Sequence, residues 1–375
     1  MNNGEDLQRA GTGSTGNVQV QVEEFVRQYC ILPDLAYLPL SLWIIATYLP
    51  QCFDCFPYMA FVSPLKQCGK TRALEVSEAL SNQPWLGTTP TPAALFRMME
   101  NTPTLLLDEV EALAAKNASE TQQSLLAILN AGHRRGATVP RCAGKNNDVV
   151  QFPVYGPKAF AGIGNLPGTL DDRCIRVQMQ RKERDQKVQR WLRPRVITAA
   201  APICASLMKF AAQNEEVVSK EYAAAIDSDL DSLRLSDREL DVWLPLFAVC
   251  AVVAPDRNEE VRQCAEFFHD SKQVGDTDDS LSIRLLSDLR EHWPDGCTWW
   301  ETSAILRTLL SLQESPWREQ GSQLSCYSLA TMLRPFGVQS AKRRIGEKAG
   351  VHAYSRAALE VCWGRYLKAP HSPRG

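Results

Sequence analysis

The stretch Phe61-Val-Ser-Pro-Leu-Lys-Gln-Cys-Gly-Lys-Thr-Arg72 decides the fold class of this chain. It predicts a buried strand that ends at Ser63, a turn, and a helix that opens at Gly69-Lys70-Thr71. This context suits the pattern G-x-x-x-x-G-K-[ST], whose backbone N–H groups and helix N-terminus hold phosphate groups. We therefore expect Lys70 to reach the β- and γ-phosphates of a nucleotide and the Thr71 hydroxyl to bind Mg²⁺.

One position departs from this pattern. Pro64 stands where the first glycine is expected, and proline neither donates an N–H nor adopts a positive φ. On the Gly-Lys-Thr tripeptide alone, an ordinary strand–turn–helix remains the alternative. The predicted nucleotide-binding residues are Ser63, Pro64, Leu65, Lys66, Gln67, Cys68, Gly69, Lys70, Thr71 and Arg72.

A second motif is Pro103-Thr-Leu-Leu-Leu-Asp-Glu109, an apolar run closed by two carboxylates. Such a run is typical of a buried parallel strand. We expect Asp108 to share the Mg²⁺ shell with Thr71, and Glu109 to orient and polarise an attacking water. A strand that ends in solvated acids is the alternative. The two motifs together favour an enzyme that hydrolyses ATP with Mg²⁺.

Composition bounds the class of protein. The chain has 375 residues, 45% hydrophobic and 22% charged, which is ordinary for a folded protein of two or three domains. Its net charge of −2 means that nucleic acid would have to be bound by local basic patches. The apolar stretch 35–50 is short for a membrane span, and the polar N-terminus shows no secretory signal. We expect a cytoplasmic protein without a membrane partner, whose 12 cysteines are reduced. Cys52-Phe-Asp-Cys55 has the spacing of a metal or redox site but no second Cys/His pair near it, so a zinc or redox role is only an alternative there.

Alternation of strand and helix patterns from Pro57 onward predicts an α/β protein with a parallel sheet. The predicted organisation is a disordered tail (1–18), a helical segment (19–56), an ATPase core (57–195), an α-helical lid (196–275) and a small C-terminal domain (276–375). Three helices and a short basic segment in that last domain suggest a winged helix. The basic run 181–195 is expected to be a solvated helix face.

Two β-rich runs flank Gly144-Lys145-Asn146-Asn147, a cluster of turn-forming residues. They predict a β-hairpin that carries Lys145 at its tip.

These residues together resemble ring-forming P-loop ATPases of the AAA+ type and superfamily-three helicases. More closely, the chain resembles a bacterial and phage-associated family of uncharacterised ATPases, often fused to primase or DNA-binding modules. The likeness covers roughly residues 23–368. In that family the phosphate loop begins Ser-Pro, as it does here. The motifs that carry it are Ser63–Thr71, Thr104–Glu109, Leu129–Arg135, Ala161–Pro167, Asp172-Arg173 and Ser236-Asp-Arg238.

The resemblance implies further roles. Asn165 stands at the sensor position, and Arg173 stands where a subunit presents an arginine finger to its neighbour's nucleotide; a salt bridge to Asp172 is the alternative for Arg173. Arg238 in the lid is a candidate second sensor or a structural residue. Lys145 corresponds to a pore lysine that grips DNA, and a merely solvated lysine is its alternative. The DNA-binding candidates are Lys145, Arg134, Arg135 and Arg141.

Two functions follow as hypotheses. The first is an ATP-driven DNA helicase or translocase: a homo-oligomeric ring on single-stranded or forked DNA, with a primase or other replication partner, serving a phage or mobile element. The second is an ATP-dependent switch or assembly module that binds DNA or protein without unwinding, for example in defence or regulation. A metabolic kinase fits poorly, because the Asp-Glu pair favours hydrolysis by water.

Overall fold

The computed structural model describes residues 16–367 except 89, 100, 102, 115–118, 144–147, 184, 229, 231–232, 273–278, 313–315, 319–323 and 347. Its contacts divide the chain into two units. The first comprises residues up to Val62, Gly69–Met179 and Val188–Lys272; the second comprises Ser63–Cys68, Gln180–Lys187 and Gln273–Gly375. The phosphate loop therefore groups with the C-terminal part of the sequence.

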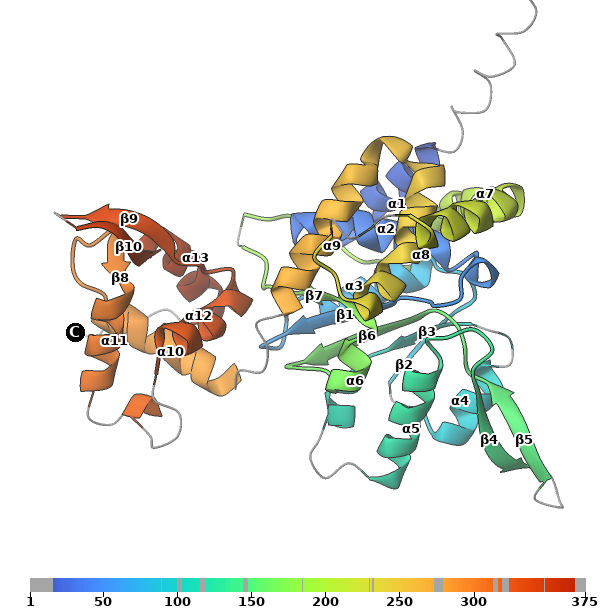
Figure 1. Cartoon of the computed structure of the whole chain (residues 1–375), viewed down its shortest axis with the longest axis horizontal. Coiled ribbons are helices and arrows are strands. Elements are labelled where there is room, and N and C mark those ends of the chain that lie inside the picture. Colours follow the sequence, from blue (N-terminus) through green and yellow to red (C-terminus); the bar gives the residue numbers. More distant parts are fainter. Residues whose placement is uncertain are drawn as a thin grey trace, which may run out of the picture. The chain divides into compact units, whose positions relative to one another are not determined.

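A five-stranded parallel sheet forms the centre of the first unit (Figure 1), and it confirms the α/β prediction. Its order is β2-β3-β6-β1-β7. Tyr58 pairs with Cys174 and Leu105 with Lys158 in parallel registers. The strands are β1 (Tyr58–Ser63), β2 (Pro84–Gly87), β3 (Thr104–Leu107), β6 (Lys158–Ile163) and β7 (Cys174–Gln178).

One face of this sheet packs on α4 (Pro92–Met99), α5 (Glu120–Ala131) and α6 (Gly168–Asp171) (Figure 1). Apolar side chains of β1, β3 and β6 meet those of the helices in one buried cluster. Helix α5 begins at Glu120, where Ser119 before it accepts the N–H of Gln122 in a capping box. The 3₁₀ turn η3 (Val110–Ala114) links β3 to this layer.

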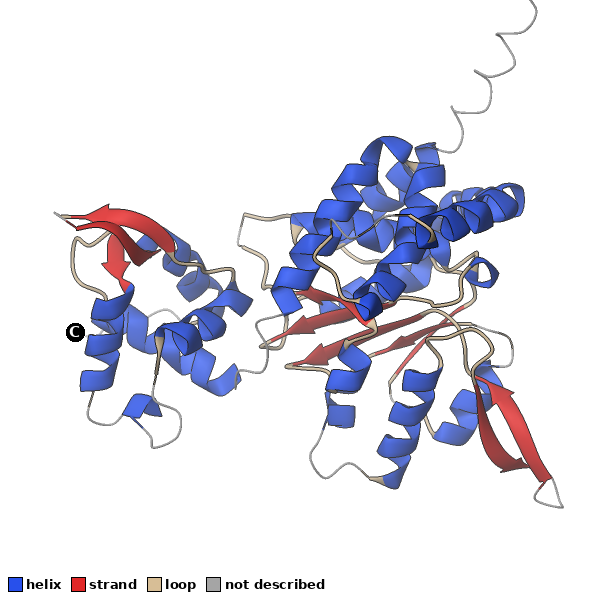
Figure 2. Ribbon diagram, in the orientation of Figure 1, coloured by secondary structure: helices blue, strands red, loops and turns tan. Residues whose placement is uncertain are grey.

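The opposite face carries α3 (Lys70–Leu80) and a layer of helices (Figures 1 and 2). In the sequence these helices come before β1 and after β7. This layer consists of α1 (Gly16–Tyr29), α2 (Tyr37–Ala46), α7 (Arg193–Ile226), α8 (Asp237–Val253) and α9 (Asn258–Lys272). Helix α7 passes the length and hydropathy test for a membrane-crossing helix, with 28% of the scored window buried. One such helix is weak evidence, and the absence of a membrane partner stays a prediction.

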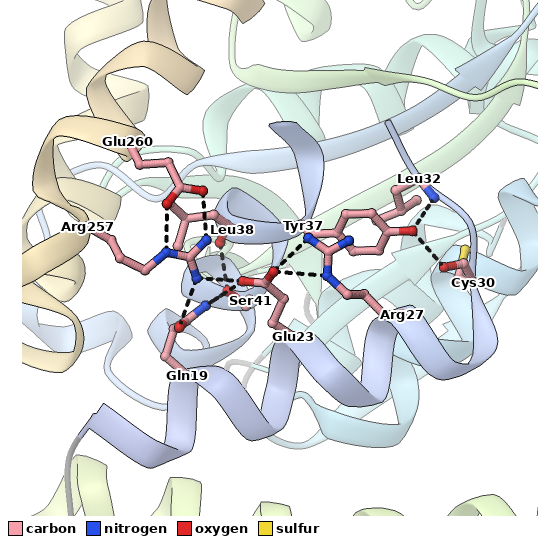
Figure 3. Close-up of polar contacts among 10 residues, drawn as sticks. All are labelled: Gln19, Glu23, Arg27, Cys30, Leu32, Tyr37, Leu38, Ser41, Arg257 and Glu260. Carbon is pink, nitrogen blue, oxygen red and sulfur yellow. Dashed lines mark hydrogen bonds and ion pairs between the residues drawn. The ribbon is translucent and has the colours of Figure 1, made fainter. Parts of the chain in front are cut away.

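A polar network joins the two ends of this helical layer (Figure 3). Glu23 of α1 lies 2.6 Å from Arg257 and 2.8 Å from Arg27, while Arg257 also holds Glu260 at 2.7 Å. Burial alone would raise the pKa of Glu23, but the hydrogen bonds from Arg257 and Arg27 hold that pKa below its ordinary value. The buried negative charge of Glu23 is therefore balanced in part by Arg257, a residue more than two hundred positions further along the chain.

The predicted hairpin is present as β4 (Thr138–Ala143) and β5 (Asp148–Pro153), which form an antiparallel two-stranded sheet. Its tip, which includes Lys145, lies outside the described residues.

Two buried basic side chains, His133 and Lys158, hold the region where α5 leads into the hairpin. Lys158 is fully buried, and its Nζ donates to the carbonyls of Val154 at 2.9 Å, Gly156 at 3.0 Å and Gly132 at 3.3 Å. His133 is 6% exposed, with Nδ1 placed 2.8 Å from the carbonyl oxygen of Phe56. We assign the proton of a neutral imidazole to Nδ1, because a carbonyl can only accept.

Stability should fall in acid because of His133. Burial lowers the pKa of His133 to about 4, whereas an unfolded histidine has a pKa near 6.5. Between these values the unfolded chain binds the extra proton, so the unfolding free energy decreases as pH falls through this window, by up to about 3 kcal/mol. Urea denaturation at pH 7 and pH 4.5 measures this loss. His133→Gln should show a smaller loss than wild type; equal losses in the two proteins would contradict the assignment.

The second unit contains a small antiparallel sheet of order β8-β10-β9 with helices around it. Its elements are α10 (Asp279–His292), β8 (Trp299–Glu301), α11 (Thr302–Ser311), α12 (Cys326–Leu333), β9 (Ala341–Ile345), β10 (Lys348–Ser355) and α13 (Arg356–Tyr366). Ser325 caps α12, because its side chain accepts the N–H of Ser328.

The prediction of a helix over 181–195 is wrong. No helix precedes Arg193 in the described part of this run, and α7 starts there with Pro194 in its first turn. Proline favours the first helical turn and disfavours a helical conformation at the residue before it, so it marks a start rather than an interior.

Candidate active site

The carboxyl ends of β1, β6 and β3 meet at one edge of the sheet, because these strands run parallel. Each strand is followed there by a predicted site segment: the phosphate loop after β1, Asn165 after β6, and Asp108-Glu109 after β3. Since β6 lies between β1 and β3, Asn165 follows the strand that separates the loop from the acids.

The strongest contact of the site joins its two motifs. Thr71 Oγ1 donates to Asp108 Oδ2 at 2.8 Å. Lys70, 9% exposed, opens α3, and Gly69 before it has φ +84°, a left-handed conformation that suits glycine. Asp108 Oδ1 accepts the N–H of Glu109 at 2.9 Å, which fixes the carboxylate.

This pair of oxygens fits Mg²⁺, which prefers hard oxygen ligands. Two neighbouring ligands of an octahedral ion at 2.0–2.1 Å stand about 2.9 Å apart, close to the separation of the Thr71 and Asp108 oxygens. Mg²⁺ usually keeps several waters and also binds substrate phosphate, so two protein ligands suffice. Among the described residues, no group of three or more His, Cys, Asp or Glu is placed to hold a metal. Burial raises the pKa of the Cys55 thiol to about 11, which disfavours the thiolate that a zinc ligand requires.

Glu109 has a strained backbone. Its φ of +58° lies in the left-handed region, which costs a non-glycine residue about 1–3 kcal/mol and is found preferentially at functional sites. The next acid, Glu111, accepts the N–H of Ile163 through Oε2 at 3.2 Å and so ties η3 to the end of β6. The sequence analysis did not single out Glu111, although an acid two residues after Glu109 was visible.

The side chain of Asn165 is oriented by Arg176, a residue of β7 that the sequence analysis also did not single out. Arg176 Nη2 donates to Asn165 Oδ1, and Arg176 Nη1 lies 3.9 Å from Asp171. The contact fixes which way the Asn165 amide faces.

The phosphate loop itself belongs to the second unit. Ser63 Oγ donates to the carbonyl of Leu65 at 2.6 Å, and Gln67 has φ +65°. The carbonyl of Lys66 accepts from Arg181 Nε at 3.2 Å and Nη2 at 3.1 Å, and from Cys68 Sγ at 3.8 Å.

Three predicted site residues, Arg72, Arg173 and Arg238, have partners outside the Thr71–Asp108 pair. Arg72 pairs with Glu75 at 3.1 Å and stacks on the ring of Trp191. Arg173 precedes β7, so it lies at the amino edge of the sheet; its carbonyl accepts the N–H of Tyr58, and its guanidinium donates to the carbonyl of Thr169. At this same edge, Arg238 pairs with Asp172 at 3.0 Å.

The described DNA-binding candidates are dispersed. Arg134 lies 3.5 Å from Asp241, and Arg135 donates to the backbone carbonyls of Phe53 and Gln51. Arg141 on β4 stands over the ring of Phe96. The structure does not gather these arginines into one patch.

The fold and the site define the class of protein: an α/β protein with a phosphate-loop-like strand–loop–helix beside an acid-tipped strand. A family model described as "Protein of unknown function (DUF3631)" matches residues 178–366, just over half of the chain. The chain belongs to this family.

One similar solved structure is described as "SCCmec type IV Cch - active helicase". It is 11% identical, with a TM-score of 0.39, and the match covers 93% of this chain and 72% of that one. A TM-score this low does not establish a shared fold. No curated protein matches the chain.

Proposed function

We propose that the chain binds ATP with Mg²⁺ at the loop 63–71 and hydrolyses it. The observation that carries this proposal is the hydrogen bond from Thr71 to Asp108. Thr71 follows the loop lysine, Lys70, and Asp108 follows β3. The hydrogen bond therefore joins segments that follow β1 and β3, two strands that β6 separates in the sheet.

In this proposal each residue of the carboxyl edge has one task. Lys70 neutralises the β- and γ-phosphates, while Thr71 and Asp108 hold the metal, which when bound offsets the charge that develops on the phosphates. Glu109 accepts a proton from the attacking water. Asn165, fixed by Arg176, positions that water or the γ-phosphate.

We further propose that hydrolysis drives a helicase-like or translocase-like motor of the AAA+ class, in a homo-oligomeric ring. Arg173 lies at the opposite edge of the sheet from Lys70, which suits a finger offered to another subunit. The element order α10-β8-α11-α12-β9-β10 supports a winged-helix assignment for the second unit. Lys342, Arg343 and Arg344 are exposed on β9, where they suit contact with a DNA backbone.

The alternative is an ATP-dependent switch or assembly module without unwinding. It is favoured by the environment of Arg134 and Arg135, which an aspartate and backbone carbonyls already engage. The DNA contact of the hairpin then depends on Lys145 and Arg141. A cytoplasmic location remains part of both proposals.

The metal pair can be tested with a matched set at one position. Thr71→Val keeps the shape of the side chain but loses the hydroxyl, and should lower ATP turnover at least about 100-fold, since a catalytic metal supplies several kcal/mol. Thr71→Ser keeps the hydroxyl and should retain most turnover. Phosphate release at saturating Mg²⁺ and ATP is the measurement; equal rates for the valine and serine variants would remove the metal role of Thr71.

The same assay separates the two functions. Turnover that rises with single-stranded DNA, together with strand displacement on a fork, supports the motor. ATP-dependent complex formation without displacement supports the switch. Failure of the wild type to hydrolyse ATP would reject both.

A further inference from the structure

Arg181 lies in a basic run, but its guanidinium contacts backbone carbonyls rather than solvent alone. Its Nε and Nη2 both donate to the carbonyl of Lys66, and its Nη1 donates to the carbonyl of Arg365 in α13, at 3.3 Å. One guanidinium thus bridges the phosphate loop and the last helix of the second unit. All three guanidinium nitrogens donate in a fixed planar arrangement, which the single ammonium group of a lysine could not reproduce.

Holding the carbonyl of Lys66 has a consequence for the next residue. In a trans peptide the C=O and the following N–H point in opposite directions, so a guanidinium on the Lys66 oxygen directs the Gln67 N–H away from itself. Gln67 has φ +65°, and a left-handed conformation costs a non-glycine residue about 1–2 kcal/mol. Such a conformation persists only where its surroundings enforce it. The Gln67 N–H is then free to face an anion, as backbone N–H groups do in anion-binding nests.

The segment that carries Arg181 is itself held by α13. Arg365, whose side chain is 14% exposed, donates to the side-chain oxygens of Gln180 and Glu183. Gly337 allows a close approach: a Cβ there would lie 3.0 Å from Gln180 Nε2, and its φ is +77°. The residues on both sides of Arg181 are therefore fixed to the C-terminal part of the unit.

We infer that Arg181 is a positioning residue that presets the phosphate loop for its anion, and that Arg365 of α13 belongs to the same device. This inference rests on the proposed nucleotide site. Arg181 acts through the peptide between Lys66 and Gln67, without touching the nucleotide. Its removal should weaken the binding of the substrate and of the transition state equally, so KM rises while kcat stays constant.

The test measures the affinity for a fluorescent ATP analogue with Mg²⁺, and the kcat and KM of hydrolysis. Arg181→Ala should raise Kd and KM about 10-fold, because hydrogen bonds from a charged donor to the loop are lost. Arg181→Lys should recover part of the loss. Lys182→Ala is the matched control: it removes the same charge from the adjacent, exposed residue and should leave Kd unchanged.

A double variant distinguishes loop positioning from general support of the fold. Gln67→Gly removes the cost of the left-handed φ, so in the Arg181→Ala background it should improve affinity about fivefold. In the wild-type background it should change affinity much less. A melting curve of each apo protein identifies any variant that fails to fold; Arg365→Lys then tests the same device from α13, with a raised Kd expected.

The outcomes are distinct. If wild type and Lys182→Ala bind ATP and Lys70→Ala does not, while Arg181→Ala binds like wild type, the positioning role is overturned and the nucleotide site stands. If Arg181→Ala lowers kcat without raising KM, or Gln67→Gly gives no rescue, the role assigned to the Lys66–Gln67 peptide is overturned. If wild type binds no ATP, the proposed function and this inference fail together.

Discussion

Glu109→Gln is expected to reduce ATP turnover by about 10²–10⁴-fold while ATP binding is retained, because the amide has the same shape but cannot accept the proton of the attacking water. Glu109 follows Asp108, which with Thr71 would hold the proposed Mg²⁺, and its φ of +58° is a strained conformation of the kind found preferentially at functional sites. Single-turnover phosphate release and binding of the ATP analogue measure the two quantities separately.

Glu111→Gln is the control for that variant. Glu111 is an acid two residues further along, and it accepts a backbone N–H of β6. Its amide variant should lower stability more than turnover. The reverse pattern, with turnover lost in Glu111→Gln and kept in Glu109→Gln, would exchange the roles of the two acids.

Arg173→Ala is expected to lower turnover about 10³-fold with little change in ATP affinity, as the loss of an arginine finger does in other systems. Arg173 lies at the amino edge of the sheet, away from the Thr71–Asp108 pair of its own chain. Its charge can reach a nucleotide only if a second subunit brings one to that edge. Arg195→Ala, at an exposed arginine of α7, is the control for general charge loss.

Mixing two inactive variants tests whether the finger acts between subunits. Lys70→Ala keeps the finger and loses the loop lysine; Arg173→Ala keeps the lysine and loses the finger. In a randomly mixed ring about a quarter of the interfaces combine an intact lysine with an intact finger, so about a quarter of the wild-type rate should return. No recovery, under conditions where the subunits exchange, would argue against a finger in trans.

The parallel sheet and its carboxyl edge could be predicted because each element there carries a local signal. Apolar runs predicted β1 and β3, and the Gly-Lys-Thr sequence predicted the start of α3. Strand β2 escaped prediction, since Pro84-Trp-Leu-Gly87 is short and bounded by residues that disfavour strands.

The supporting residues could not be predicted, because their partners are distant in sequence. Arg176, which orients Asn165, has no motif of its own. Arg181 lies in a charged run whose composition suggests a solvated face, and only tertiary structure shows it in contact with Lys66. Local sequence patterns identify residues that would bind the nucleotide or the metal directly. Residues that position those side chains, such as Arg176 and Arg181, are found only from their contacts in the structure.

The contact chain from Lys66 through Arg181 to Arg365 also bears on how the protein is made. During synthesis β1, the loop and α3 leave the ribosome about three hundred residues before the helix that completes their support, and domains generally fold in the order in which they emerge. Arg181 thus lacks its own partner on α13, the carbonyl of Arg365, until that helix is translated. A nascent chain should therefore acquire its full nucleotide affinity only after α13 has been translated.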